Sequence, residues 1–325
     1  MRSHKTRNSP DILENTIRQH SDLLEILLLD KTKSTKQKAH NILWATDSYT
    51  HHKATSEIKI ADITGEHTLL IQPRISKSKE EQKLRTHDKA EVFTPKEIVQ
   101  QMNQDIDWGL GHWPADYNNW QDYVSEKRLE ITCGEAPFIV GRYNASSGKK
   151  VLKLENRVGF LDRKLQVVSE FCDNIDDWLK WTKTAFKSSY GYEWQGDSLL
   201  IARENLLYTF IDYYNAKFPD RFIDMESKLK NIDLELLKEI ATIISWNIFQ
   251  MDGLKYVIPM SCKHTEEVVN EAPGLLKLLG EKDVVKKRIC EGCVKSDPKL
   301  HNGRKVKIMD WDADKPIYFY KLVER

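Results

Sequence analysis

The C-terminal part of the sequence carries cysteine and histidine residues at the spacing of metal ligands. Cys290 and Cys293 form a Cys-x2-Cys pair, and Cys262 and His301 flank it on either side. Three thiolates and one imidazole complete the tetrahedral coordination that a structural Zn²⁺ prefers. His301 is favoured over His264 as the histidine ligand, because His264 lies only two residues from Cys262. The alternatives are a reduced pair of surface cysteines or a redox pair, although no thioredoxin-like sequence surrounds Cys290.

A loop of small residues follows an apolar stretch near the middle of the chain. Residues 129–138 read Leu-Glu-Ile-Thr-Cys-Gly-Glu-Ala-Pro-Phe, which predicts a strand that ends in a tight loop at Cys133-Gly134 and turns into a helix. In open α/β sheets such a loop lets a nucleotide approach the backbone, and the helix N-terminus faces the ligand. Most turns of this kind only connect a strand to a helix, so the pattern gains weight from the segments that accompany it.

Two acidic residues are predicted at the ends of later strands. Residues 190–207 read as a strand that ends at Glu193, a turn at Gln195-Gly196 and then a helix. Residues 243–249 read as an apolar strand that Asp252-Gly253 closes. A carboxylate at the position of Glu193, next to a glycine turn, is where a doubly wound fold holds the ribose hydroxyls of a nucleoside. In such a site, the carboxylate of Asp252 would accept a hydrogen bond from an exocyclic amine. An Asp-Gly turn without chemistry is the simpler interpretation of Asp252.

A helix is predicted after residues 91–95, which read Glu-Val-Phe-Thr-Pro. Thr94 suits the N-cap position and Pro95 the first helical position. The buried face of this helix is expected to consist of Ile98, Val99 and Met102. A capped helix start of this kind also offers free amide donors and a hydroxyl group to a carboxylate.

Composition narrows the class of protein. The chain has 325 residues, of which 40% are hydrophobic, and its 50 basic and 49 acidic residues nearly cancel. It is therefore expected to be globular, without a global positive field for nucleic acid. No segment is long and apolar enough to suggest a signal core or a membrane span. Five cysteines without a secretion signal favour a reducing cytoplasm.

The positions of these segments predict three parts. Residues 1–89 form an N-terminal extension with an amphipathic helix over residues 11–30 and short strands. Residues 90–260 form an α/β domain, in which residues 151–162 are predicted as a hairpin or strand. Residues 261–325 form a small C-terminal segment, interpreted as a zinc ribbon.

In this order, the segments resemble those of the adenine-N6 DNA methyltransferases and of the methylation (M) subunits of restriction–modification systems. Residues 91–95 resemble the family's Gly-Glu-x-Phe-Thr-Pro segment. Residues 129–138 resemble its Asp-Pro-Ala-Cys-Gly-x-Gly-x-Phe loop, with Glu130 in place of Asp, Thr132 in place of Ala and Ala136 in place of the second Gly. Residues 190–207 resemble Tyr-Gly-Ile-Glu-Ile-Asp-Pro followed by an Ala-Arg-x-Asn-Leu-Leu helix.

The resemblance implies a doubly wound, Rossmann-like sheet that binds S-adenosylmethionine. It implies that the segment Phe93-Thr94-Pro95 holds the methionine carboxylate, that Glu193 holds the ribose, and that Asp252 meets the adenine amine. The remaining cofactor contacts would come from the loop after the first strand, namely Glu130, Thr132, Cys133, Gly134 and Phe138.

One motif of the family is missing. The (Asp/Asn)-Pro-Pro-(Tyr/Phe) segment holds and stacks the flipped target adenine in these enzymes. This sequence contains no Pro-Pro pair, and its one Asp-Pro, Asp297-Pro298, is followed by Lys-Leu. No catalytic residue is therefore assigned. The expected function is that of an M subunit, or half of a split one, which methylates adenine in DNA only together with a second chain that supplies the target-base motif or the specificity subunit.

Two alternatives remain open. The chain could be a non-catalytic, methyltransferase-like regulatory protein that binds the cofactor or DNA. A restriction nuclease is a third hypothesis, because Pro219-Asp220 and Glu226-Ser-Lys228 have the letters of a Mg²⁺-dependent nuclease site. Only five residues separate Asp220 from Glu226, which is short for a site of that kind.

Overall fold

The computed structural model describes residues 15–80, 82–83, 94–109, 119–144, 147–227, 229–270 and 284–323, without the side chains of residues 266–270 and 284–287. Phe93, which was predicted to contact the cofactor, lies outside the described residues, as does Lys228 of the nuclease hypothesis.

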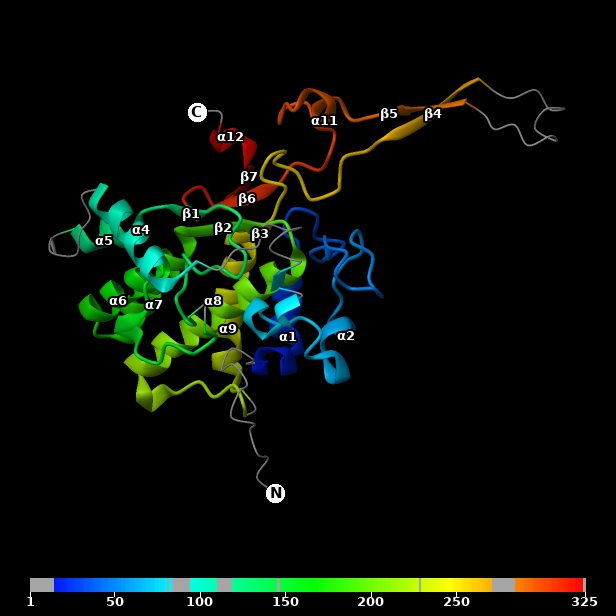
Figure 1. Ribbon diagram of the computed structural model, residues 1–325. Coiled ribbons are helices and arrows are strands. Elements are labelled where there is room, and N and C mark those ends of the chain that lie inside the picture. The colour runs from blue at the N-terminus through cyan, green and yellow to red at the C-terminus, as the bar shows by residue number, and fades with distance from the viewer. Residues whose placement is uncertain are drawn as a thin grey trace.

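A three-stranded parallel sheet lies at the centre of the protein (Figure 1). It consists of β1 (Arg128–Glu130), β2 (Ser189–Glu193) and β3 (Ile248–Gln250), in that order across the sheet. Leu129 pairs with Tyr190, and Gly191 pairs with Ile248. The fold is thus mixed α/β with a parallel sheet, as the sequence predicted.

Helices cover one face of this sheet. The longer helices among those that share its main hydrophobic core are α1 (Ser21–Leu28), α6 (Phe160–Phe171), α7 (Ile175–Lys187), α8 (Gly196–Lys217) and α9 (Asn231–Asn247). Helices α7, α8 and α9 pack on β2, and α8 and α9 also pack on β3. Because side chains alternate along a strand, only every second strand residue faces this core.

A β-hairpin covers the opposite face. It consists of β6 (Lys307–Asp310) and β7 (Lys315–Tyr318), and Ile308 of β6 packs with Tyr190, Tyr192 and Phe249 of the central sheet. A doubly wound sheet carries helices on both faces. Here the helices that share the main core and the hairpin lie on opposite sides of the sheet, as Figure 1 shows.

A second hairpin extends away from the body of the protein (Figure 1). It consists of β4 (Thr265–Asn270) and β5 (Val284–Arg288), which pair antiparallel. The remaining elements are η1 (Thr16–Gln19), α2 (Ile60–Ile63), η2 (Gly65–His67), η3 (Arg74–Ser76), α4 (Lys96–Gly109), α5 (Trp120–Ser125), η5 (Leu154–Asn156), η6 (Pro219–Arg221), α11 (Glu291–Lys295) and α12 (Tyr320–Val323). Within the described residues, no helix is long and apolar enough to cross a membrane.

Two predicted strands differ in the structure. The strand predicted over residues 243–249 is the last part of α9 followed by β3, because Ile240, Ile243 and Ile244 bury one helical face. Short apolar runs do not distinguish a strand from a buried helix. The hairpin predicted over residues 151–162 is instead the single turn η5 followed by the start of α6.

Candidate functional site

The ends of the three parallel strands meet at one edge of the sheet, and each of them carries a predicted site residue there. Cys133 follows β1, Glu193 ends β2 and Asp252 follows β3. The backbone N–H of Cys133 donates to the carbonyl of Tyr192 at 2.8 Å, and the N–H of Met251 donates to the carbonyl of Glu193 at 3.0 Å. These bonds extend the strand pairing beyond the sheet and hold the loops after β1 and β3 against the end of β2.

The buried carboxylate of Glu193 accepts three backbone hydrogen bonds. Its Oε2 accepts from the N–H of Gly134 at 2.8 Å, and its Oε1 accepts from the N–H groups of Trp194 at 2.8 Å and Gln195 at 3.1 Å. Burial raises the pKa of Glu193, while the three N–H donors oppose this shift by stabilising the charged form. The structure thus brings Gly134 and Glu193 together through a hydrogen bond that joins the loop after β1 to the end of β2.

The helix predicted directly after Cys133-Gly134 is absent. In the described part of residues 131–159, the chain makes turns and the single turn η5, and the next α-helix is α6. Thr132, Gly134 and Ala136 have φ angles of 49°, 53° and 66°, in the left-handed region. Three such residues in alternation cannot continue into a right-handed helix.

Glu130 holds this loop closed. Its carboxylate accepts from the N–H of Phe138 at 3.3 Å and from the N–H of Ile139 at 3.2 Å. Desolvation raises the pKa of Glu130 well above its usual range, and the nearby charge of Glu193 acts in the same direction. Phe138 therefore belongs to the loop through its backbone, and two carboxylates lie near each other at the sheet edge.

Close packing under the loop favours a glycine in β2. A Cβ atom on Gly191 would lie 3.2 Å from the Sγ of Cys133 and 2.9 Å from the Cδ1 of Ile139. The buried thiol of Cys133 thus sits directly against the sheet, and burial raises its pKa well above the usual range. Cys133 has a packing role in the loop rather than the character of a reactive thiolate.

Asp252 lies in a turn with a partner that sequence reasoning missed. Its Oδ1 accepts from the N–H of Leu254 at 3.1 Å, and its Oδ2 lies 3.2 Å from the Nζ of Lys255. Burial lowers the pKa of Lys255, but the bond to Asp252 and the neighbouring thiols of Cys293 and Cys262 outweigh this and raise it. The spacing Asp252-Gly-Leu-Lys255 is the signal that could have indicated this pair.

The helix that starts after Thr94 differs in detail from the prediction. Helix α4 begins at Lys96, and the carbonyl of Pro95 accepts from the N–H groups of Ile98 and Val99. Pro95 rather than Thr94 therefore occupies the N-cap position.

The buried face of α4 is also different. Val99 is buried as predicted, but Ile98 and Met102 are 45% and 49% exposed, and the polar residues Asn103 and Asp107 are buried instead. Asn103 donates to the carbonyls of Phe138 and Val158 at 3.1 and 2.9 Å. Asp107 pairs with Arg128 at 2.6 Å and also with Arg163. These polar contacts turn the helix so that Ile98 and Met102 face outward.

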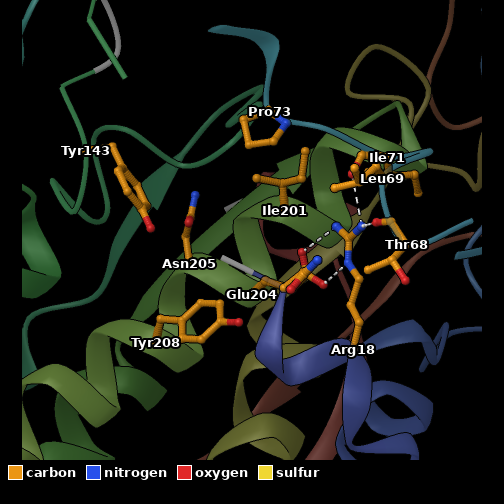
Figure 2. A pocket seen from close by; sticks show the side chains of 11 residues that line it. Arg18, Thr68, Leu69, Ile71, Pro73, Tyr143, Ile201, Glu204, Asn205 and Tyr208 are labelled. Atoms are coloured by element: carbon orange, nitrogen blue, oxygen red, sulfur yellow. Dashed lines mark hydrogen bonds and ion pairs between the residues drawn. The ribbon is translucent and has the colours of Figure 1, made fainter. Parts of the chain in front are cut away.

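A small cavity of about 20 Å³ lies beside the loop after β1 (Figure 2). The side chain of Arg18 forms two bonds to Glu204, at 2.7 and 2.8 Å, and donates to the carbonyls of Thr68 and Ile71. Asn205, which also lines the cavity, donates to the carbonyl of Glu135 at 3.2 Å. This volume suits a water molecule rather than a cofactor.

A larger groove of about 880 Å³ lies between α7 and α9, with Leu179, Leu236 and Trp311 among its lining residues. Neither this groove nor the small cavity is lined by the predicted cofactor residues. At the sheet edge, the structure brings together Cys133, Gly134 and Glu193 and places Asp252 after the neighbouring strand. Thr94 takes part in none of the hydrogen bonds of Glu193 and Glu130 described above for the carboxyl edge of the sheet.

The predicted metal ligands converge. Cys262, Cys290, Cys293 and His301 each present one donor atom, and the four atoms lie within 4.8 Å of one another. The Nδ1 of His301 lies 3.6 Å from the Sγ of Cys262, 3.8 Å from that of Cys290 and 3.5 Å from that of Cys293. His264 instead accepts the backbone N–H of Cys290 at 3.2 Å. This Cys₃His cluster could hold a metal ion.

The comparisons with known proteins leave the family open. No protein-family model, no curated protein and no solved structure matches this chain.

Proposed function

We propose that this chain binds S-adenosylmethionine at the carboxyl edge of β1, β2 and β3, and that it is the M subunit, or half of a split M subunit, of an adenine-N6 DNA methyltransferase in restriction–modification. The observation that carries the proposal is the 2.8 Å bond from the N–H of Gly134 to the carboxylate of Glu193. It joins the loop after β1 to the acidic end of β2, which is the pair of elements that a Rossmann-like nucleoside site uses.

Glu193 is the proposed ribose ligand. A carboxylate offers about four lone-pair sites, and three backbone N–H groups bind to that of Glu193, so one acceptor site remains for a ribose hydroxyl. Ala136 supports the same assignment, because its φ of 66° lies in the region that favours the glycine of the resembled motif. The loop would lie along the cofactor backbone, with Glu130 keeping it closed.

Asp252 is the proposed acceptor for the adenine amine. Its Oδ2 is shared with Lys255, whose side chain is partly exposed and is held by one bond at 3.2 Å. When the cofactor is bound, S-adenosylmethionine would supply the electrophilic methyl group. This chain's own residues would hold the cofactor and exclude water from its nucleoside end.

The missing target-base motif requires a partner, and we propose that this partner docks at the free edge of β1. In the described part of the chain, β1 pairs only with β2. The N–H of Arg128 donates to Ser188 on the β2 side, so the backbone groups of Leu129 face away from β2. Leu129 in β1 and Ile131, directly after this strand, are 42% and 65% exposed. In doubly wound sheets the second half of the fold is added beside the first strand, at this position.

Isothermal titration calorimetry with S-adenosylmethionine tests the cofactor site. We expect the wild-type chain to bind and Glu193→Ala to lose at least tenfold in affinity, whereas Asp173→Ala, at an exposed acid far from the sheet edge, binds like the wild type. Circular dichroism shows whether each variant is folded. A folded wild-type chain that does not bind, or a folded Glu193→Ala that binds equally well, overturns the assignment.

Transfer of a labelled methyl group to unmodified DNA tests the activity. We expect no transfer by this chain alone and transfer at adenine N6 when the product of the neighbouring gene is added. Cofactor binding without transfer under either condition identifies the chain as a non-catalytic, methyltransferase-like regulator. Mg²⁺-dependent cleavage of DNA by the chain alone would instead support the nuclease hypothesis.

A further inference from the structure

The distances in the Cys₃His cluster match those of a zinc site. In tetrahedral zinc centres the Zn–S distance is about 2.3 Å and the Zn–N distance about 2.0–2.1 Å, which places sulfur and nitrogen ligands about 3.6 Å apart. The three distances from the Nδ1 of His301 to the sulfur atoms are 3.6, 3.8 and 3.5 Å. Thiols that only packed against an imidazole would have no reason to lie at three nearly equal distances from one nitrogen atom.

We propose that Cys262, Cys290, Cys293 and the Nδ1 of His301 bind one Zn²⁺ as a structural ion. Four protein ligands fill the tetrahedral coordination sphere, which leaves no open position for water or substrate. Three thiolates and a neutral imidazole around Zn²⁺ have a net charge of −1. This inference does not depend on the proposed methyltransferase function.

The surroundings of the ligands are those of an ordered metal centre. The backbone N–H of Asn302 donates to the Sγ of Cys290 at 3.3 Å, which stabilises a thiolate. The amide of Asn302 also ties the two ligand segments together, because its oxygen accepts from the N–H of Lys263 and its nitrogen donates to the carbonyl of the same residue. Cys290 and His301 are buried.

The ion would fasten two segments that run side by side to the central sheet. One leads from Asp252 after β3 to the ligand Cys262, and the other leads from the ligand His301 to β6. The N–H of Ile258 donates to the carbonyl of Arg304 at 2.9 Å, and the N–H of Arg304 donates to the Oγ of Ser261 at 3.0 Å.

These two segments pack so closely that a side chain would not fit between them. A Cβ atom on Gly303 would lie 2.7 Å from the Oγ of Ser261 and 3.2 Å from the Sγ of Cys262. Further along, the N–H of Val306 donates to the carbonyl of Tyr256 at 3.0 Å. Zinc binding therefore stabilises the turn of Asp252 and the hairpin β6–β7 that covers the sheet.

Metal analysis of the full chain tests the ligand set. We expect one zinc per chain in the wild type, and strong thiolate-to-metal absorption when Co²⁺ replaces Zn²⁺. His301→Ala and Cys293→Ser should each lose this absorption and lower zinc affinity at least 100-fold. His264→Ala and Cys172→Ser are the matched controls and should keep one zinc per chain. Loss of zinc in these controls, or retention in His301→Ala, overturns the ligand assignment.

Hydrogen exchange on the wild-type chain tests the structural role even if a ligand variant does not fold. Removal of zinc with a chelator should increase amide exchange in residues 252–262 and 301–306 at least tenfold, and leave the amides of β1 and β2 unchanged. Addition of Zn²⁺ should restore the protection. Equal exchange with and without zinc shows that the ion does not stabilise these two segments. A chain that takes up no zinc overturns the site itself.

Discussion

The backbone N–H of Gly134 lies 2.8 Å from the Oε2 of Glu193, 59 residues further along the chain. This bond joins the loop after β1 to the end of β2 and leaves a buried carboxylate at the sheet edge. Both the proposed cofactor site and the shape of the loop depend on it. Its removal should therefore lower both the affinity for the cofactor and the free energy of unfolding, and each of these can be measured independently.

Glu193→Gln should destabilise the fold by about 1–3 kcal/mol. The amide nitrogen of Gln cannot accept a hydrogen bond, so at least one of the three buried N–H groups loses its acceptor. Urea denaturation followed by circular dichroism measures this change. Asp173→Asn, at an exposed position, should change the free energy of unfolding by less than about 0.5 kcal/mol. Equal stability of Glu193→Gln and the wild type would show that the carboxylate does not hold the loop.

Arg18→Met should cost about 3–5 kcal/mol, because it leaves the buried carboxylate of Glu204 without its partner. The double variant Arg18→Met/Glu204→Leu should recover part of this loss, since neither charge then remains buried. Denaturation of the single and double variants completes a double-mutant cycle. A coupling energy near zero would contradict the bidentate contact shown in Figure 2.

Thr132→Gly should stabilise the protein by about 0.5–1 kcal/mol. Thr132 has a φ of 49°, and this left-handed conformation is strained for a β-branched residue, whereas glycine adopts it without strain. Thr132→Ala is the matched control, because alanine keeps the Cβ atom and therefore the strain. Thermal unfolding should rank Gly above Ala and Thr. If the glycine variant is the least stable, the loop is not strained at this position.

Asp162 should make stability fall as the pH rises from about 4 to about 6. Burial raises its pKa from 3.8 to about 6, which outweighs the opposing effects of Arg157 and of the Gly141 N–H. The folded state then binds the proton more tightly than the unfolded chain, so ionisation favours unfolding. The difference corresponds to about 3 kcal/mol. Asp162→Asn cannot ionise and should remove this slope from denaturation curves measured across that range.

Leu129→Lys and Ile131→Lys should weaken association with the proposed partner at least tenfold without changing the chain's own unfolding temperature. Both side chains are exposed, but a strand added to β1 would bury them. Leu152→Lys is the control, because Leu152 is also exposed and belongs neither to β1 nor to the turn directly after it. Analytical ultracentrifugation measures the association. Unchanged binding of both β1-edge variants would place the interface elsewhere.

The parts of the structure that could be predicted depend on local signals. The strand end at Glu193 and the helix that follows Gln195-Gly196 are adjacent in the sequence, and both occur where expected. His301 could be preferred over His264 because two residues leave too little room for His264 and Cys262 to bind one ion together.

The parts that could not be predicted depend on distant partners. Helix α4 buries Asn103 because the carbonyls of Phe138 and Val158 accept its hydrogen bonds. It buries Asp107 because Arg128 and Arg163 form ion pairs with that carboxylate. These partners lie far from α4 in the sequence, so no local pattern predicts the contacts. The left-handed conformation of Thr132 could not be predicted either, because a β-branched residue rarely adopts it. The cover that β6–β7 provides for Tyr190 and Tyr192 likewise follows from tertiary packing.

The absence of a helix directly after β1 bears on which nucleotides the sheet edge would admit. Dinucleotide sites place a pyrophosphate on the amide groups at such a helix start. Here the N–H groups of Gly134, Phe138 and Ile139 are already bound to the carboxylates of Glu193 and Glu130. A phosphate would meet two acidic side chains and none of these donors. Because these amide donors are occupied, ATP and NAD should bind weakly at this edge, and a nucleoside without a phosphate at this position should bind better.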